Sequence, residues 1–322
     1  MRVLVLHSDI GAEAPPDELD TLVTAKAVAE ALTLRGHQVS SAAFVPEPAA
    51  MLKSIASAGA EAVFNLVESV HGNGALAGMA PAMLELHGIS YTGSSAASLA
   101  VSADKILSKQ VLKAAGLPTA EWAEPPRWEG LVPDRRYVVK SVTEDASLGL
   151  DDGAVIAGVA VPDRAKASKE RHGGRWFAEA YLDGREFNVA LLEQDHAVRV
   201  LPIPEMRFEA WGNRPRIVGY TAKWDENSHD AKNTVRSFGI EDDQPALARL
   251  LADYALETWK LFRLRGYARI DFRIDAKGAP MILEANPNPC LEPHAGFAAA
   301  AGCANIPYAE LVEHILRTAV LR

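Results

Sequence analysis

The sequence has little cysteine and no long apolar run. Only two of its 322 residues are cysteine, Cys290 and Cys303, which is too few for a disulfide framework or a cysteine-rich zinc site. No segment approaches the roughly 18 consecutive apolar residues of a membrane span, and residues 2–6 read as a strand where a signal peptide would carry a longer apolar stretch. The sequence therefore predicts a cytoplasmic protein with reduced thiols and no membrane partner.

Basic residues are too few for a nucleic-acid-binding surface. The chain has 33 Lys and Arg against 42 Asp and Glu, which gives a net charge of -9 without a concentrated basic stripe. Nucleic acid is therefore excluded as the expected partner. Hydrophobic residues make up 48% of the chain and charged residues 23%, so the chain can bury a full core. Its length favours two or three domains that share one cleft.

Several common enzyme motifs are also missing. Residues 7–11 read His-Ser-Asp-Ile-Gly, not the GxGxxG of a dinucleotide-binding loop, which argues against a dehydrogenase. Neither GxSxG nor HExxH occurs, so the sequence supports neither a serine hydrolase nor a zinc site of that type. Residues 72–74 (Gly-Asn-Gly) lack a Walker lysine and are predicted to form a turn.

Short apolar runs alternate with helical stretches in residues 1–100. We expect strands at residues 3–6, 38–42 and 62–66, and helical stretches around residues 22–32, 51–58 and 75–87. This alternation predicts an α/β fold with a parallel sheet and helices on both faces. Ligands bind at the carboxyl ends of the strands in such sheets, so the loops at 7–18 and 68–74 are expected to face a substrate.

The rest of the chain is predicted to be α+β, with antiparallel strands. The expected helices span residues 103–115 and 246–263, and the expected strands span residues 136–140, 176–181, 186–192, 267–274 and 280–285. A domain boundary is expected near residue 100. Asp183-Gly184 predicts a hairpin between strands 176–181 and 186–192, and residues 275–278 predict a second hairpin between the last two strands.

Two acidic residues and an asparagine follow the pattern of a metal site. Asp271 lies on one strand of the second hairpin, and Glu284 and Asn286 lie on its partner, two residues apart and therefore on one face. Hard oxygen ligands on adjacent strands suit Mg²⁺. Two acids beside a hairpin also fit a solvated surface pair. The apolar residues 281–283 before Glu284 argue against simple exposure, because an unpaired buried carboxylate is costly.

Two lysines are candidates for phosphate contacts. Lys140 ends an apolar strand and Lys105 opens a helix, so either ammonium could meet a phosphate as a point charge. Each also fits a solvated lysine, and Lys105 could pair with an acid instead. The loop at 143–149 has small residues and backbone amides that could close over a triphosphate, although an ordinary surface loop would look the same.

The order of these segments along the chain resembles the ATP-grasp superfamily and, within it, the D-alanine–D-alanine ligase-like family. The segments that carry the resemblance are Phe64-Asn65-Leu66, Tyr91-Thr92-Gly93-Ser94, Ala103-Asp104-Lys105 with Lys109, Val138-Val139-Lys140, Glu179-Ala180-Tyr181-Leu182, Gly184-Arg185-Glu186-Phe187, Ala222-Lys223, Arg269-Ile270-Asp271 and Glu284-Ala285-Asn286. The resemblance implies an ATP-grasp fold: an N-terminal Rossmann-like domain (1–100), a central ATP-binding lid subdomain (101–181) and a C-terminal catalytic subdomain (182–322).

The resemblance also implies a reaction. The family phosphorylates a carboxylate with ATP, and an amine then attacks the acyl phosphate, which releases ADP and phosphate. The implied substrates are a small-molecule carboxylate and an amine, such as amino acids or a peptide. The family often forms homodimers through its N-terminal domain, and the residues themselves indicate no oligomeric state.

Individual residues take roles by the same resemblance. Lys105 and Lys140 would contact the ATP phosphates, Glu144 and Ser147 would belong to the lid, and Glu186 would hold the ribose. Adenine would meet Glu179 and the backbone of Ala180, Tyr181 and Leu182. Asp271, Glu284 and Asn286 would hold two Mg²⁺, or Mn²⁺ in their place. The implied catalytic residues are Lys223 at the γ-phosphate and Arg269 at the acyl phosphate and tetrahedral intermediate. His71 is a further catalytic candidate for a different reason: it follows a strand of the sheet and could touch the substrate, although a lone histidine is more often a hydrogen-bonded structural residue.

The chain departs from the family mainly where substrates would bind. The first loop is long and rich in proline, and residues 71–76 contain no acid, although Glu68 precedes them. The lid reads Glu-Asp-Ala-Ser at 144–147 in place of Glu-Gly-Ser-Ser. Ala295 replaces a serine expected at the substrate carboxylate, and Trp224 replaces a tyrosine. These changes favour a related carboxylate–amine ligase over a true D-alanine–D-alanine ligase; a non-catalytic nucleotide-binding protein is the alternative of another class.

Overall fold

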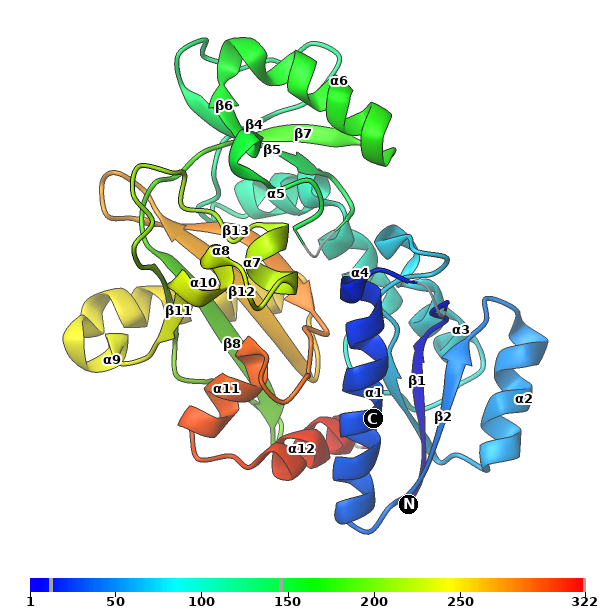
Figure 1. The fold of residues 1–322 in the computed structure, drawn as a ribbon. Coiled ribbons are helices and arrows are strands. Elements are labelled where there is room, and N and C mark those ends of the chain that lie inside the picture. Colours follow the sequence, from blue (N-terminus) through cyan, green and yellow to red (C-terminus); the bar gives the residue numbers. More distant parts are fainter. Residues whose placement is uncertain (12–13, 145–146, 321–322) are drawn as a thin grey trace.

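The computed structural model describes residues 1–11, 14–144 and 147–320, and Figure 1 shows the arrangement of its elements. These residues form three sheets. Residues Asp145 and Ala146 of the predicted lid, and residues 12–13 of the first loop, lie outside the described residues. Among the helices described, none is both long and apolar enough to cross a bilayer.

The N-terminal sheet is parallel, as predicted. It consists of β1 (Arg2–Ser8), β2 (Gln38–Phe44) and β3 (Ala62–Leu66) in the order β2-β1-β3. Helix α1 (Pro16–Leu34) connects β1 to β2, and α2 (Pro48–Ala58) connects β2 to β3. Alternate side chains of β1 enter different cores: Val3 and Val5 pack with α1, whereas Leu4 and Leu6 pack on the side of α2. The sheet is therefore buried on both faces.

A series of short helices connects the N-terminal sheet to the next one. After η1 (Gly74–Leu76) and α3 (Met79–Leu86), the chain forms α4 (Ala96–Ala103) and α5 (Lys105–Ala114). The predicted helix over 103–115 therefore begins at Lys105. Asp104 is the reason, because its Oδ1 accepts hydrogen bonds from the backbone N–H groups of Ile106 and Leu107 at 3.0 and 2.9 Å, which caps α5.

The central sheet is antiparallel, and a helix covers one of its faces. Its strands are β4 (Trp122–Ala123), β5 (Arg136–Ser141), β6 (Val155–Ala157) and β7 (Trp176–Ala180), in the order β4-β7-β5-β6. Helix α6 (Val161–His172) packs on it, with Val161 and Ala165 against Tyr137 and Trp176. Two turns of 3-10 helix, η2 (Asp152–Ala154) and η3 (Gly158–Ala160), flank β6.

The predicted hairpin between residues 176–181 and 186–192 is wrong. β7 belongs to the central sheet, whereas β8 (Glu186–Gln194) lies in the C-terminal sheet and pairs with β12 (Tyr267–Ile274). The link between them runs along the end of β12, where Ile274 N–H donates to the Arg185 carbonyl at 2.9 Å. Gly184 lies so close to the Ile274 carbonyl that a Cβ there would be 2.0 Å from the oxygen. β8 therefore gains its partner from a distant part of the chain.

The C-terminal sheet contains the second predicted hairpin, which is confirmed. Its order is β11-β10-β8-β12-β13, with β9 (Ala197–Val200) also paired to β8. The other strands are β10 (Glu205–Phe208), β11 (Thr234–Ser237) and β13 (Pro280–Pro287). The helices of this region are α7 (Tyr220–Trp224), α8 (His229–Asn233), α9 (Ile240–Asp243), α10 (Pro245–Leu261), α11 (Gly296–Cys303) and α12 (Tyr308–Val320). The α+β character expected for this part is confirmed.

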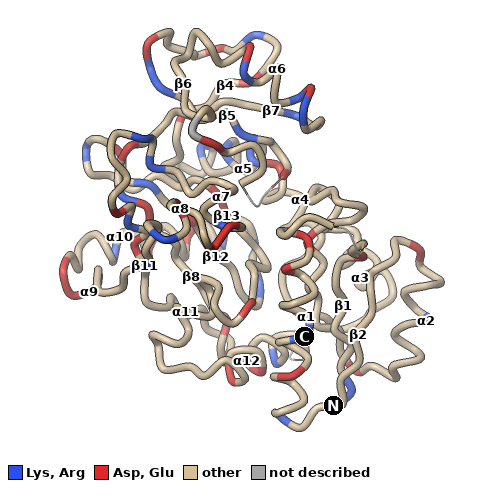
Figure 2. Tube along the Cα trace, in the orientation of Figure 1, with Lys and Arg blue, Asp and Glu red and all other residues tan. Residues whose placement is uncertain are grey.

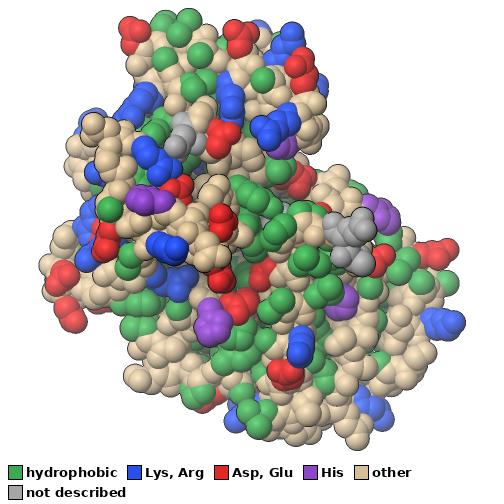
Figure 3. All heavy atoms as spheres, viewed as in Figure 1, with side chains coloured by type: hydrophobic (Ala, Val, Ile, Leu, Met, Phe, Trp, Pro, Cys, Tyr) green, Lys and Arg blue, Asp and Glu red, His purple; other side chains and the backbone are tan. Residues whose placement is uncertain are grey.

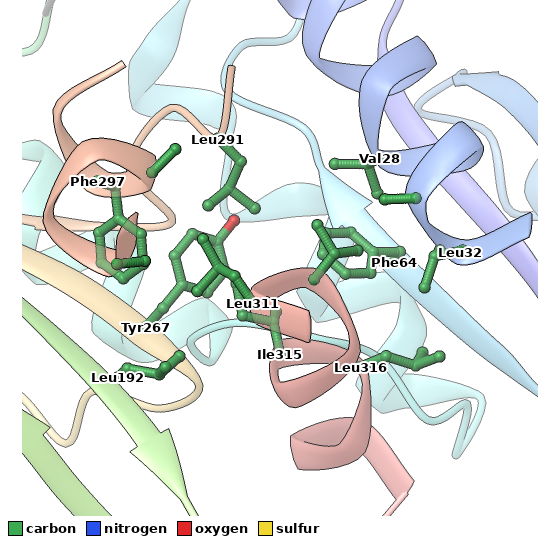
Figure 4. Packing of buried hydrophobic residues seen from close by; sticks show 14 of the residues in the cluster. Val28, Leu32, Phe64, Leu192, Tyr267, Leu291, Phe297, Leu311, Ile315 and Leu316 are labelled. Carbon is green, nitrogen blue, oxygen red and sulfur yellow. The ribbon is translucent and has the colours of Figure 1, made fainter. Parts of the chain in front are cut away.

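One apolar core joins the first sheet to the last. Figure 4 shows Phe64 of β3 and Leu32 of α1 packed on one side of α12, with Tyr267 and Phe297 on the other. All four side chains are buried, and full burial of such a side chain contributes about 1.5–3 kcal/mol. The C-terminal helix thus fixes the N-terminal sheet against the C-terminal one. The three sheets fall one in each of the ranges 1–100, 101–181 and 182–322, whose assignment as domains stays a prediction.

Candidate active site

The three predicted metal ligands lie together in the middle part of the β12–β13 hairpin. Asp271 and Glu284 are opposite each other in the register of the two strands. Asn286 Nδ2 lies 3.0 Å from Asp271 Oδ2 and 3.5 Å from Glu284 Oε1. Asp271 is only 6% exposed, so the interpretation of these acids as a solvated surface pair is wrong for it.

Arg269 neutralises Asp271 through a two-pronged ion pair. Its Nε lies 2.7 Å from Oδ1 and its Nη2 lies 2.8 Å from Oδ2, the planar geometry that arginine forms with a carboxylate. Asn188 Nδ2 donates a further hydrogen bond to Oδ1 at 2.9 Å. Burial raises the pKa of the Asp271 carboxyl, and the charge of Arg269 opposes that rise. Sequence reasoning missed Asn188, whose only signal is its position two residues after Glu186 on the same face of β8.

Glu284 lies in a field of positive charge. Burial acts to raise its pKa, but nearby cations outweigh burial and bring the pKa of Glu284 down to about 2. These cations come from four different elements and are Lys105, Lys140, Lys223 and Arg269. Figure 2 shows acidic residues at β12 and β13 with basic residues on the elements around them. Four cations exceed the charge of Asp271 and Glu284, so the site favours a polyanion such as a triphosphate.

Lys105 and Lys140 are fixed in place and do not extend into solvent. Lys105 is the first residue of α5 and is 8% exposed, and its Nζ donates to the Glu144 carbonyl at 3.1 Å. Lys140 lies on β5, and its Nζ donates to Glu179 Oε1 at 2.8 Å. The interpretation of these residues as solvated surface lysines is therefore wrong.

A third lysine completes this part of the site, and sequence reasoning gave it no role. Lys109 Nζ lies 2.5 Å from Glu179 Oε2 and donates hydrogen bonds to Thr119 Oγ1 and the Ala120 carbonyl at 2.8 and 3.2 Å. Burial acts to raise the pKa of Glu179, but Lys109 and Lys140 lower it overall. The signal available in the sequence is the spacing of four residues between Lys105 and Lys109, which places both on one face of α5.

The predicted adenine contacts lie where β7 ends. Ala180 N–H donates to the Glu121 carbonyl at 2.8 Å, and Tyr181 N–H donates to the Arg136 carbonyl at 3.0 Å. The N–H groups of Ala180 and Tyr181 therefore already donate hydrogen bonds within the protein. Leu182 N–H forms no hydrogen bond within the part of the chain that the structure describes, so it is the backbone donor left for a base.

Glu186 lies on the face of β8 that also carries Asn188. Its Oε2 accepts both hydrogen bonds from Arg273, from Nε at 3.1 Å and Nη2 at 2.7 Å. Arg273 also donates to the Leu182 carbonyl at 2.8 Å, which links the predicted ribose and adenine contacts. Because Arg273 engages a single carboxylate oxygen of Glu186, Oε1 has room for a further donor.

The described end of the lid contacts the segment before Lys223. Ser147 Oγ donates to the Val218 carbonyl at 2.8 Å, and Tyr220 N–H donates to the Leu150 carbonyl at 3.1 Å. Lys223 itself is exposed on α7. Figure 3 shows charged side chains around the hollow in the middle of this face of the molecule.

The comparisons with known proteins agree on one family. The family model described as "D-ala D-ala ligase C-terminus" matches residues 136–317. The chain is 33% identical to an uncharacterized protein of Sinorhizobium fredii over 80% of its length and 74% of that protein. It is 28% identical to the D-alanine–D-alanine ligase of a Synechococcus strain, over 100% of this chain and 94% of that one. The chain belongs to the D-alanine–D-alanine ligase-like family of ATP-grasp proteins.

Solved structures support the same fold. The D-alanine–D-alanine ligase of Bacillus anthracis complexed with ATP has a TM-score of 0.75 at 19% identity and covers 100% of this chain and 98% of its own. A second structure of that ligase has a TM-score of 0.77 at 20% identity, with the same coverage. The predicted ATP-grasp fold is confirmed. As a family member, the protein is an ATP-dependent ligase that forms a C–N bond of the amide type.

The donors at the hairpin fit the magnesium that is typical of this family. Asp271 and Glu284 supply carboxylate oxygens and Asn286 supplies an amide oxygen, all hard ligands. No group of three or more His, Cys, Asp or Glu side chains suited to a metal occurs among the residues that the structure describes. A set with two acids and one amide leaves coordination positions for phosphate oxygens and water, which Mg²⁺ prefers to a closed protein cage.

His71 is separate from this cluster. It is exposed in a turn, with φ of 52°, and none of the described residues forms a hydrogen bond or ion pair with it. The same turn reaches the lid, because Gly74 N–H lies 3.5 Å from Glu144 Oε2. The catalytic role of His71 stays a prediction.

The loop after Asn286 is held by the Thr-Gly-Ser segment of the N-terminal part. Ser94 N–H donates to Asn288 Oδ1 at 3.1 Å, and a Cβ on Gly93 would lie 2.2 Å from that oxygen, so only glycine fits. Further along this loop, Cys290 Sγ lies 3.1 Å from Asp20 Oδ2. Burial, followed by the charges of Glu68 and Asp20, raises the pKa of the Cys290 thiol. Both acids therefore lie close to Cys290.

Proposed function

We propose that the protein joins the carboxylate of one small molecule to the amine of another, through an acyl phosphate made with ATP. We infer that the carboxylate belongs to an amino acid. The observation that carries the proposal is the convergence of Lys105, Lys140, Lys223 and Arg269 on Glu284. A site with this excess of positive charge suits a reaction in which a phosphoryl group passes between two anions.

The proposed reaction has two steps. An oxygen of the carboxylate attacks the γ-phosphorus of ATP, so an acyl phosphate forms and ADP leaves. The amine nitrogen then attacks the acyl carbon, the bond from that carbon to the phosphate oxygen breaks, and phosphate leaves while the nitrogen loses a proton. Lys105, Lys140 and Lys223 would hold the phosphates. The Arg269 guanidinium would stabilise the acyl phosphate and the negative oxygen of the tetrahedral intermediate.

The nucleotide would lie against the central sheet. Leu182 N–H is the donor suited to an adenine ring nitrogen, and the buried carboxylate of Glu179 suits the adenine amino group. The Oε1 atom of Glu186 suits a ribose hydroxyl, since Arg273 engages only Oε2. The buried pairs that hold Glu179 and Glu186 keep both acceptors in one position before the nucleotide arrives.

Asp271, Glu284 and Asn286 would hold the metal, with two Mg²⁺ ions as the proposed number and Mn²⁺ as a substitute. The metal would supply positive charge that offsets the charge of the phosphate oxygens. Arg269 restrains Asp271 from the other side, and Asn188 fixes the same carboxylate. Glu144 and Ser147 would close the lid over the reactants, which matters because an acyl phosphate hydrolyses readily if water enters.

The substrates are proposed to differ from two molecules of D-alanine. The relatives in Bordetella petrii and Synechococcus are named D-alanine–D-alanine ligases, at 29% and 28% identity. This chain has Ala295 and Trp224 where the family usually has serine and tyrosine, and no acid in residues 71–76. The phosphate and metal residues match the family, so we propose the same reaction with a different acceptor. His71, beside the lid, is proposed to face the substrates.

The test is ATP-dependent phosphate release across a panel of D- and L-amino acids and small amines, with mass spectrometry of every active mixture. We expect ADP, phosphate and a product lighter than its two components by one water. Labelling the donor carboxylate with ¹⁸O should transfer one label to the released phosphate, because the acyl carbon to oxygen bond breaks. AMP and pyrophosphate as products, or unlabelled phosphate, would contradict the acyl phosphate.

A matched pair of variants ties the activity to the site. Glu284→Gln should abolish release, whereas Glu257→Gln, an exposed position on α10, should leave it unchanged. ATP binding without release under any amine, in the unaltered protein, would support the non-catalytic alternative. Turnover with D-alanine alone would show that the changed residues do not alter the substrate.

A further inference from the structure

Arg236 is an arginine without a carboxylate partner beside the active site. It lies on β11 and is partly buried, and its Nη1 donates one long hydrogen bond, 3.4 Å, to the His294 carbonyl. Within the described ranges of the chain it forms no ion pair. Arg269 and Arg273 of the same sheet differ, because each donates two hydrogen bonds to one carboxylate. A partly buried guanidinium without a counter-charge is costly unless an anion arrives from outside the chain.

The register of the sheet places Arg236 on the same face as the reaction site. Arg236 is opposite Met206 of β10, and Met206 is opposite Glu186 of β8. Residues directly opposite on neighbouring strands project from one face of a sheet. Glu186 is in turn opposite Arg273 of β12, and alternation along β12 puts Arg269 and Asp271 on that face as well.

The end of the Arg236 side chain lies where the loop after β13 enters α11. Its Nη2 is 3.6 Å from the position that a Cβ on Gly296 would occupy. Burial, followed by the charge of Arg269, lowers the pKa of Arg236. The two guanidinium groups therefore lie within electrostatic range of each other, and Asp271 neutralises only Arg269.

The start of α11 adds to the positive potential at this point. Its N-cap residue, Ala295, has an extended backbone (φ −66°, ψ 164°) and no side chain that could accept from the first N–H groups. The first turn of a helix attracts anions through these N–H groups and the helix dipole. An arginine and an uncapped helix start thus flank the same small region, next to Arg269.

We propose that Arg236 binds a carboxylate of the amine substrate, a carboxylate that does not react. This inference rests on the proposed ligase function. The carboxylate that is activated must lie at Arg269 and the metal ligands, so a second cation farther along the same face serves a second anion. The acceptor is then an amino acid, or a peptide with a free carboxylate, and not a simple amine. Arg236 is a specificity-determining residue because it selects the acceptor by charge.

The test is competition between an acceptor and its amide. The donor found in the panel of amino acids is held constant, and equal amounts of glycine and glycinamide, or of D- or L-alanine and the matching alaninamide, compete for it. Mass spectrometry of the two products gives the ratio of their kcat/KM values. We expect the unaltered protein to prefer the free acid by about 30-fold or more, the range of a charge-assisted pair. Arg236→Gln should reduce that preference to within about threefold, and Arg236→Lys should retain part of it.

The ratio of the two kcat/KM values distinguishes a loss of carboxylate binding from a general structural defect, because a structural defect slows the formation of both products equally. The control is Arg207→Gln, since Arg207 lies on β10 next to Met206 and therefore on the opposite face. Arg207→Gln should keep the preference of the unaltered protein for the acid over the amide. An unchanged ratio in Arg236→Gln, or an unaltered protein that accepts acid and amide equally, would overturn the proposal.

Binding provides a second readout if no ligation occurs. Thermal shifts of the complex with a non-hydrolysable ATP analogue are measured for the same acid and amide pairs. Stabilisation by the acids only, lost in Arg236→Gln, would support the carboxylate site while the ligase function failed. Equal or no stabilisation by acids and amides would overturn the carboxylate site.

Discussion

Lys109 and Glu179 form an ion pair that solvent does not reach. The two charged groups are 2.5 Å apart, and their side chains are 1% and 3% exposed. The second oxygen of Glu179 binds Lys140 at 2.8 Å, so one buried carboxylate lies between two lysines. Lys109 therefore holds Glu179, and Glu179 holds Lys140 at the proposed phosphate site. The trio keeps one net positive charge, which suits an anionic ligand.

Lys109→Met should destabilise the protein by about 3–5 kcal/mol, the cost of leaving one partner of a buried pair uncompensated. Denaturant unfolding measures this change. The exposed pair Lys166–Glu170 at 4.0 Å is the control, and Lys166→Met should cost less than about 0.5 kcal/mol. Equal losses in the two variants would mean that burial does not set the strength of the Lys109 pair.

The sequence predicted those parts of the fold that depend on local pattern. The β12–β13 hairpin combines alternating strands with a tight turn, so its register, and with it the meeting of Asp271 and Glu284, follows from neighbouring residues. The parallel N-terminal sheet likewise follows from the alternation of strands and helices. Family resemblance added the residue roles, which local pattern alone leaves open.

Other features depend on contacts between distant residues. β7 and β8 are close in sequence and separated by turn residues. β8 nevertheless pairs with β12, about eighty residues later, because the buried side chains of β8 pack with those of β12 and α10 in one core. No local signal identifies such a partner. Arg236 is similar: the sequence shows an arginine on a short strand, and only the sheet register shows that it faces the site without a carboxylate.

Glu205 should make stability depend on pH in the acid range. Two hydrogen bonds from Arg185, both 2.8 Å, lower the pKa of Glu205 below its ordinary value of 4.5, although burial opposes this. A lowered pKa in the folded state adds stability above about pH 4.5, and that stability is lost as pH falls through the folded-state value. Glu205→Gln should therefore be less stable than the unaltered protein at neutral pH. In denaturant unfolding, this difference in stability should shrink as the pH falls below 4.5 and through the lowered pKa of Glu205 in the folded state. A stability difference that does not change with pH would contradict the lowered pKa of Glu205.

Arg269→Ala should lower turnover at least ~100-fold and leave the dissociation constant for ATP nearly unchanged, because the role proposed for the guanidinium is to stabilise charge that develops in the reaction. Arg269→Lys keeps a charge near Asp271 but loses the two-pronged geometry, so it should recover only part of the rate. Arg199→Ala, at an exposed position of β9, is the control. Weak ATP binding with normal turnover in Arg269→Ala would contradict the role proposed for Arg269.

Asp271→Asn should raise the Mg²⁺ concentration for half-maximal activity at least ~10-fold, because it removes one of the two charged members of the proposed ligand set. The measurement is a Mg²⁺ titration at saturating ATP. Asp253→Asn, on the exposed side of α10, should leave the titration unchanged. The same Mg²⁺ dependence in both variants would place the metal elsewhere.

Gly219→Ala should uncouple the lid from the segment that carries Lys223. Gly219 has φ of −78°, which alanine also adopts, so the substitution adds no backbone strain. Its new Cβ would lie 2.7 Å from the Leu150 carbonyl, a backbone atom that cannot rotate away. The two segments must then separate, which weakens the hydrogen bonds of Ser147 to Val218 and of Tyr220 to Leu150.

Each of those bonds is worth about 1 kcal/mol, so kcat/KM for ATP should fall about 5- to 30-fold in Gly219→Ala. Gly302→Ala is the matched control, because a Cβ in that helical position meets nothing within 4 Å. It should leave kcat/KM unchanged and stabilise α11 by about 0.5–1 kcal/mol. If Gly219→Ala retained full activity, the contact between the lid and α7 would have no part in nucleotide use, and Lys223 would have to reach the γ-phosphate independently of the lid.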